Sequence, residues 1–324
     1  MLYAMSEPAP EVEGMQYDPF DRVLKKRYKT MLQQAKNYIE KRLFGEALKA
    51  INGILEDVHN LALRSDWVYK TFCDPVEFMV ASLRWQSGKL YWDKTKYKQL
   101  HWLDLPISEA YLARAFIHVE ENQIPEAIRD LETAIEWNPI HAEYFFELGY
   151  IYNWRLSDPQ RSLDLCIQGL QNTYRKSSLA TGYRSIGAAL IDLGDLNTAE
   201  AAYLKSLHLE PTSKLAREQL VYISELKPTV SIDGSLESCD RVLMSKGIPT
   251  NIDPDFAEAF SGLGQACMQQ KLFQQAVDYY ESAIEINSGL PSAHAGLALA
   301  YAELKEFDLA EKHAKIALEI KGDI

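Results

Sequence analysis

Histidine and cysteine are the residue types in this chain best suited to metal binding and nucleophilic catalysis, and the sequence has seven histidines and four cysteines. No two histidines share the i, i+4 spacing that places two metal ligands on one helix face, and no two cysteines form a C-x-x-C pair. The sequence also lacks G-x-G-x-x-G, a P-loop, H-E-x-x-H and G-x-S-x-G. We therefore expect a protein that is not an enzyme and that has no catalytic residue, metal site or cofactor. The residues considered are His59, His101, His118, His141, His208, His294 and His313, with Cys73, Cys166, Cys239 and Cys267.

A basic stretch with interleaved aromatic residues is the second candidate for chemistry. Lysines beside aromatic rings suit single-stranded nucleic acid or an acidic protein, because amines neutralise phosphates while bases stack on rings. The alternative is a long helix whose aromatic residues pack and whose lysines are solvated. The acidic charge of the whole chain favours this alternative. The lysines are Lys89, Lys94, Lys96 and Lys98, and the tyrosines among them are Tyr91 and Tyr97.

Charge and composition exclude several classes of protein. Of the 324 residues, 34 are Lys or Arg and 46 are Asp or Glu, so the net charge of −12 repels phosphate backbones and anionic membranes. No apolar run reaches the roughly 18 residues of a membrane helix. The few, widely spaced cysteines favour a reducing compartment, and we expect a cytoplasmic protein. Nucleic acid is a disfavoured partner.

The side chains that could bind a partner must be positioned by helices, because apolar residues recur with helical spacing in units of 34 residues. The segment that begins at Tyr183 and ends at Ser206 places the same residue types at the same intervals as the segment from Phe260 to Ala283. Small residues such as Gly187 and Gly264 recur where two helices would cross closely. Six copies are clear, beginning near Tyr28, Ser108, Ala142, Ala180, Ala257 and Pro291.

This pattern resembles the tetratricopeptide repeat, which has an aromatic residue or Leu at position 4, Leu-Gly at 7 and 8, Tyr at 11, Ala at 20 and 27, and Pro at 32. The resemblance implies an all-α fold, a right-handed superhelical solenoid of stacked antiparallel helix pairs with about eight units. We expect repeats over 18–61, 108–213 and 257–324, with one, three and two units respectively. Two divergent helical units separate them: a Trp- and Lys-rich unit over 62–107, and a unit over 214–256 that has a long loop at 227–235. An acidic flexible arm over 1–17 precedes the first repeat.

Four departures from the repeat pattern stand out. Arg114 occupies an apolar position, and the unit at Ala142 needs one extra residue near Ser157. The loop at 227–235 is long enough to act as a hinge. The last helix has an apolar face without a covering helix, so a homodimer through the terminal repeat is possible. That face contains Leu309, His313, Ile316 and Ile320.

The resemblance also implies where a ligand would bind, because the first helices of such repeats line a concave groove. Aromatic residues at these positions suggest a contact site, and the alternative is that the superhelix buries them. Asn153 and Arg184 are polar groups suited to a peptide amide or a terminal carboxylate. The set of Lys, Asn and Arg residues with which one subfamily clamps acidic C-termini is not present. The predicted groove residues are Leu112, Phe116, Phe146, Tyr150, Asn153, Trp154, Arg184, Ala188 and Ile191.

These observations favour a non-enzymatic scaffold or adaptor that binds a peptide segment of a protein partner in its concave groove. Two alternatives stay open. One is a regulatory sensor whose superhelix changes shape when a peptide binds, and the other is a nucleic-acid-associated factor that uses the Lys89–Lys98 region.

Overall fold

A computed structural model describes residues 19–59, 61, 63, 65–90, 92–226 and 232–322. It is mainly helical, as the repeat pattern predicts, and it divides into two compact units. The central unit comprises residues 23–61 and 105–252, and the C-terminal unit comprises 62–104 and 253–322. The predicted arm over 1–17 lies outside the described residues. No helix in the described part of the chain has the length and apolar character that a membrane crossing requires.

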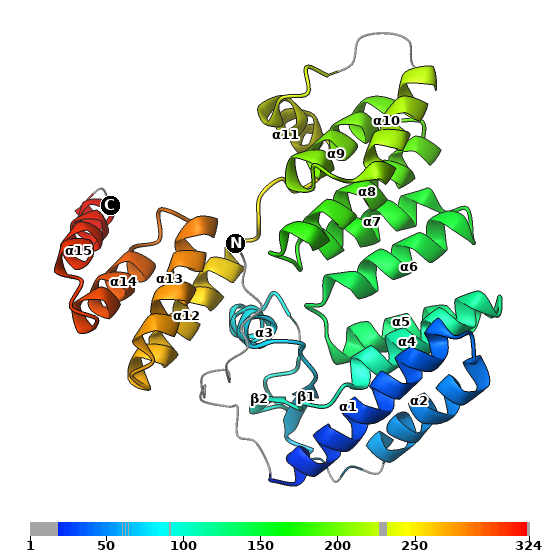
Figure 1. Cartoon of the computed structure of the whole chain (residues 1–324), viewed down its shortest axis with the longest axis horizontal. Coiled ribbons are helices and arrows are strands. Elements are labelled where there is room, and N and C mark those ends of the chain that lie inside the picture. The colour runs from blue at the N-terminus through cyan, green and yellow to red at the C-terminus, as the bar shows by residue number, and fades with distance from the viewer. Residues whose placement is uncertain are drawn as a thin grey trace. The chain divides into compact units, whose positions relative to one another are not determined.

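Stacked helix pairs form the central unit (Figure 1). In three pairs, α4 with α5, α6 with α7 and α8 with α9, consecutive helices pack on each other, and each pair packs on the next. The helices α10 and α11 both pack on α9. The helices are α1 (Pro19–Glu40), α2 (Phe44–His59), α4 (Ile107–Glu120), α5 (Ile124–Trp137), α6 (Ala142–Trp154), α7 (Pro159–Leu170), α8 (Lys176–Asp192), α9 (Leu196–Leu209), α10 (Lys214–Leu226) and α11 (Leu236–Ser245).

The N-terminal helix pair joins this stack directly. Tyr28 of α1 donates a hydrogen bond to Asp57 of α2 over 3.1 Å, and α2 packs on α4. The prediction that residues 62–107 form a unit of one continuous array is therefore wrong, because the stack continues from α2 to α4 without them. Of the predicted hinge loop at 227–235, residues 227–231 lie outside the described residues.

Turn geometry accounts for the extra residue near Ser157. In the turn after α4, the amide of Gln123 donates to the carbonyl of His118, five residues earlier. In the turn after α6, the amide of Asp158 donates to Tyr152, six residues earlier. Ser157, which precedes Asp158, has a φ of 54°, and Asn122, which precedes Gln123, has a φ of 59°, so both turns end on a residue in the left-handed region and the extra residue lies between Tyr152 and Ser157. The insertion predicted from the sequence is confirmed.

Close helix crossings explain the small residues of the repeat. A methyl group added to Gly187 of α8 would lie 2.6 Å from the ring of Tyr203 on α9, and Tyr203 is buried. Gly264 has the same relation to Tyr280, at 2.8 Å. Because a larger residue would push the ring out of its place, the small residue determines how closely each pair packs.

The C-terminal unit contains two helix pairs, and its α12 packs on α3. Two short strands, which pair in parallel with Trp67 opposite Gln99 and Lys70 opposite Trp102, flank α3 in the sequence. The predicted helical character of 62–107 is therefore wrong outside α3. Three of the four residues of β1 are aromatic or β-branched, and such residues favour extended structure. The elements are β1 (Trp67–Lys70), α3 (Pro75–Ser87), β2 (Gln99–Trp102), α12 (Asp255–Gln269), α13 (Phe273–Ile286), α14 (Pro291–Glu303) and α15 (Phe307–Gly322).

Candidate binding face of the central unit

Four exposed side chains form a stripe along α6. Glu143, Glu147, Tyr150 and Trp154 follow the i, i+4, i+7, i+11 spacing of one helix face, and all four are exposed. Trp154 is 62% exposed and Tyr150 is 48% exposed, and the two ring centres lie 6.4 Å apart. Large aromatic rings at this exposure, adjacent to one another, are typical of a contact surface.

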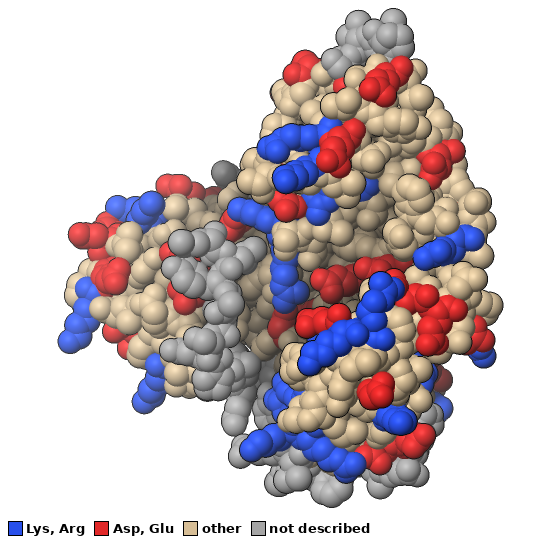
Figure 2. Space-filling view, turned by 45° about the vertical axis from the view of Figure 1, so that its right-hand side comes forward, with Lys and Arg blue, Asp and Glu red and all other residues tan. Residues whose placement is uncertain are grey.

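The neighbouring first helices extend this stripe. On α4, Phe116 is 48% exposed and Leu112 is partly buried. On α8, which packs beside α6, Ala188 and Ile191 are partly buried and Asp192 is exposed. We call the exposed side of α4, α6 and α8 the aromatic–acidic face. Figure 2 shows Asp and Glu side chains along a hollow of the central unit, with Lys and Arg side chains beside them.

Phe146 does not belong to this face. It is only 4% exposed, because its ring fills the space between α6, α7 and α8. A methyl group on Gly169 would lie 2.3 Å from the ring, and one on Gly182 would lie 2.8 Å from it. The prediction that Phe146 contacts a ligand is therefore corrected: two glycines from neighbouring helices make room for it in the core.

Asn153 also lies inside the packed structure. Its side-chain amide donates to the Asp192 carboxylate over 2.7 Å and thereby links α6 to α8. The side-chain oxygen of Asn153 is buried and has no hydrogen-bond partner among the described residues. Asn153 therefore orients Asp192 at the end of the aromatic–acidic face, which differs from its predicted direct contact with a ligand.

Arg184 is engaged by groups of its own hairpin. Its guanidinium donates to Glu210 over 2.7 Å and to the hydroxyls of Ser206 and Thr181 over 3.1 and 3.0 Å. These bonds use three of the five N–H donors of the guanidinium. The sequence placed Arg184 correctly on α8, but the charge it would offer to an acidic peptide is neutralised by Glu210.

The carboxyl group of Glu147 has a raised pKa. Although the Glu147 side chain reaches the surface, desolvation by the surrounding atoms raises the pKa of its carboxyl above the ordinary value, and the nearby Glu143 raises it further. Glu143 itself lies 3.5 Å from the ring of His141. No cationic side chain in the described ranges forms an ion pair with Glu147. The face thus carries a carboxylate that a bound cation would stabilise.

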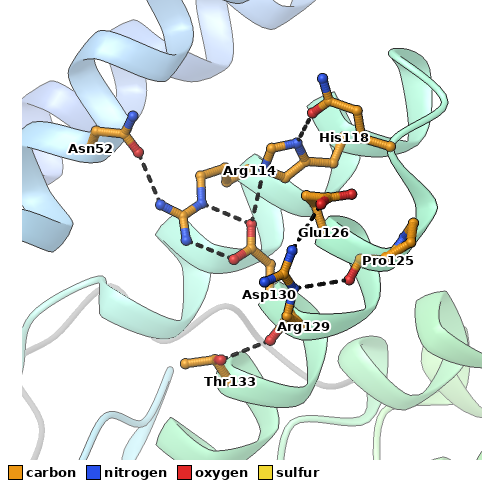
Figure 3. A network of polar contacts seen from close by, with 9 residues as sticks. Asn52, Arg114, His118, Pro125, Glu126, Arg129, Asp130 and Thr133 are labelled. Carbon is orange, nitrogen blue, oxygen red and sulfur yellow. Dashed lines mark hydrogen bonds and ion pairs between the residues drawn. The ribbon is translucent and has the colours of Figure 1, made fainter.

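A polar network beneath this face explains the departure at Arg114 (Figure 3). Arg114 binds both oxygens of Asp130 on α5, over 2.8 and 2.7 Å, and donates to Asn52 on α2 over 2.9 Å. His118 lies 3.5 Å from the same carboxylate. The Asp130 hydrogen bond raises the pKa of Arg114. Asp130 was missed by sequence reasoning, although a cation at an apolar position required a nearby carboxylate.

The predicted secondary surface is held by local contacts in the C-terminal unit. Lys89 binds Asp255 over 2.8 Å, and Lys94 donates to a backbone carbonyl. Lys96 lies over the ring of Tyr97, and Lys98 lies 4.0 Å from Asp66. These contacts are those of packed aromatics and paired lysines; Tyr91 lies outside the described residues.

The cysteines of the helix cores lack the features of nucleophiles. Burial raises the pKa of the Cys166 thiol to about 12 and those of Cys239 and Cys267 to about 11. A thiol with such a pKa is protonated near neutral pH and is poorly nucleophilic.

The structure brings together two histidines that lie far apart in the sequence. His294 Nδ1 of α14 and His313 Nδ1 of α15 are 3.1 Å apart. His294 donates through Nε2 to the Ser288 carbonyl, so its Nδ1 accepts the proton of His313. Desolvation, followed by His294 and Lys312, lowers the pKa of His313, against a smaller effect of Glu281. On the predicted dimer face of α15, Leu309 is exposed, whereas His313, Ile316 and Ile320 are partly buried.

Comparison with known proteins identifies the repeats. Three segments match family models described as tetratricopeptide repeat, residues 108–141 and 181–213 in one model and 257–290 in another. They cover most of the pairs α4–α5, α8–α9 and α12–α13.

Solved structures of other repeat proteins are similar to this chain. A tetratricopeptide repeat protein from Parabacteroides merdae is 10% identical, with a TM-score of 0.42, and the match covers 91% of this chain and 93% of that protein's chain. The first such repeat domain of Spaghetti (RPAP3), bound to an HSP90 peptide, is 20% identical, with a TM-score of 0.35 and coverage of 38% and 94%.

Proposed function

This chain belongs to the tetratricopeptide repeat family, and from that premise we propose that it is a non-catalytic scaffold that binds a peptide segment of a protein partner on the aromatic–acidic face. Repeats of this kind stack into extended surfaces suited to peptides. The observation that carries the proposal is the pair of exposed rings, Tyr150 and Trp154, on a first helix of the stack. Trp and Tyr dominate the binding energy of many interfaces.

The surroundings of the two rings support their role as anchors. Buried Phe146 and the Asn153–Asp192 hydrogen bond tie α6 to α7 and α8, so the exposed rings project from a fixed backbone. A rigid surface loses less conformational entropy when it binds, and more of the contact energy appears as affinity.

The test compares wild-type protein with the Tyr150→Ala/Trp154→Ala double variant. Proteins retained from the native lysate are identified by mass spectrometry, and the binding of each purified partner is then measured by calorimetry. We expect the double variant to bind at least about 2 kcal/mol more weakly, roughly 30-fold in Kd, because truncated aromatic anchors typically lose this much.

Tyr222→Ala is the matched control. Tyr222 lies on α10 of the same unit and is 46% exposed, much like Tyr150, but it lies outside the aromatic–acidic face. Its affinity should equal that of wild type. Equal binding by the double variant, with far-UV circular dichroism unchanged, would contradict the proposal.

A further inference from the structure

We propose that the segment bound by the aromatic–acidic face is cationic, with one or more Lys or Arg side chains next to apolar side chains. This inference rests on the proposed function and specifies the chemistry of the partner. It differs from the expectation at sequence level, in which Asn153 and Arg184 were candidates for holding a terminal carboxylate.

The charges of the face carry the first step. Glu143, Glu147 and Asp192 are exposed on adjacent helices, and Figure 2 shows acidic groups along the hollow. The guanidinium of Arg184 is paired with Glu210. A negatively charged segment would meet like charges there, and such juxtaposition costs several kcal/mol. A positively charged segment would find complementary groups.

The aromatic rings carry the second step. Tyr150 lies between Glu147 and Trp154 along the same helix face, and the two ring centres are 6.4 Å apart. The methylene stem of Lys or Arg packs on apolar surface while its charged end reaches a carboxylate. A cation over an aromatic ring gains further attraction. The order of carboxylates and rings along α6 therefore matches a basic side chain flanked by apolar ones.

The state of Glu147 adds independent support. Its raised pKa means that the surroundings disfavour the charged carboxylate. A cation in contact would lower that pKa again, so the bound state recovers part of the cost of holding a charge there. Binding of a neutral segment would leave this cost in place or increase it by removing water.

A random library of 12-residue peptides displayed on phage tests the proposal. The immobilised full chain selects binders at low salt, and the selected peptides are synthesised and titrated against wild type and variants. We expect an excess of Lys and Arg over Asp and Glu in these peptides, together with Leu, Phe or other apolar residues. Their affinities should fall as salt rises, because the ion pairs are partly solvated.

Two isosteric variants separate charge from shape. Glu147→Gln and Glu143→Gln should each weaken binding up to about fivefold, the upper range for one partly exposed ion pair. Glu218→Gln is the control, because Glu218 is exposed on α10 away from the face and the substitution changes the net charge equally. Its affinity should not change. Circular dichroism checks that all variants are folded.

The outcomes distinguish the two proposals. Peptides that require Tyr150 and Trp154 but carry no basic excess, or whose affinity is the same with Glu147→Gln, would overturn the cationic partner and leave the scaffold function standing. Failure to select any peptide, or peptides that bind the Tyr150→Ala/Trp154→Ala variant as well as wild type, would overturn both.

Discussion

Replacing Arg114 by Leu would leave the Asp130 carboxylate inside the α4–α5 hairpin without its bidentate guanidinium partner. Asp130 is 6% exposed, and both of its oxygens accept from Arg114. Removing one partner of a buried ion pair costs about 3–5 kcal/mol. Because the Arg114 side chain is 24% exposed, water can partly replace it. We therefore expect a loss near the lower end, about 3 kcal/mol in the free energy of unfolding.

A second substitution separates the unpaired charge from the lost contacts. In the Arg114→Leu/Asp130→Leu variant no buried charge remains, and an apolar pair of this kind is often neutral or stabilising. We expect it to recover most of the loss, apart from the hydrogen bond to Asn52, which contributes about 1 kcal/mol.

Urea unfolding at pH 7, followed by circular dichroism, measures these free energies. Hydrogen exchange with mass spectrometry on peptides from α4 and α5 shows whether the loss is local, because repeat arrays can unfold in parts. A loss below about 1 kcal/mol for Arg114→Leu, or a double variant no more stable than the single one, would refute the reasoning.

Two further predictions concern titratable groups. The lowered pKa of His313 means that its neutral form is favoured in the folded state. The contribution of His313 to the stability of the α14–α15 pair is therefore fully present above its unfolded pKa of about 6.5, and it is lost as pH falls through that value towards the folded pKa. Amides of α14 and α15 should exchange faster at pH 5 than at pH 7, relative to intrinsic rates, and His313→Gln should flatten this dependence; an equal pH effect in both proteins would contradict it. N-Ethylmaleimide should modify the native protein only at the exposed Cys73, because Cys166, Cys239 and Cys267 are buried. Mass spectrometry should therefore show one adduct before denaturation and further adducts only after unfolding. Rapid labelling of Cys166 in the native protein would contradict its burial.

The helix pairs and their tight crossings could be predicted from the sequence because they depend on local spacing. Apolar residues at helical intervals define two faces, and a small residue such as Gly187 opposite a buried ring such as Tyr203 lies within one repeat. The exposed rings of Tyr150 and Trp154 were found in the same way, since their positions follow from the frame of a single helix.

Whether other residues are buried or ion-paired depends on side chains in neighbouring elements. Phe146 is buried because Gly169 and Gly182, from two other helices, leave room for its ring. Arg184 is neutralised by Glu210 at the far end of its hairpin. Nothing in the spacing around either residue identifies these contacts.

The segment between α2 and α4 shows the same limit at the level of topology. Its β1 and β2 pair in parallel although 28 residues separate Lys70 from Gln99, and parallel pairing requires such a crossover connection. A local pattern determines which residues can form a helix. Which surfaces meet is a property of the whole folded chain, because burial and ion pairing are decided by side chains that approach from other elements.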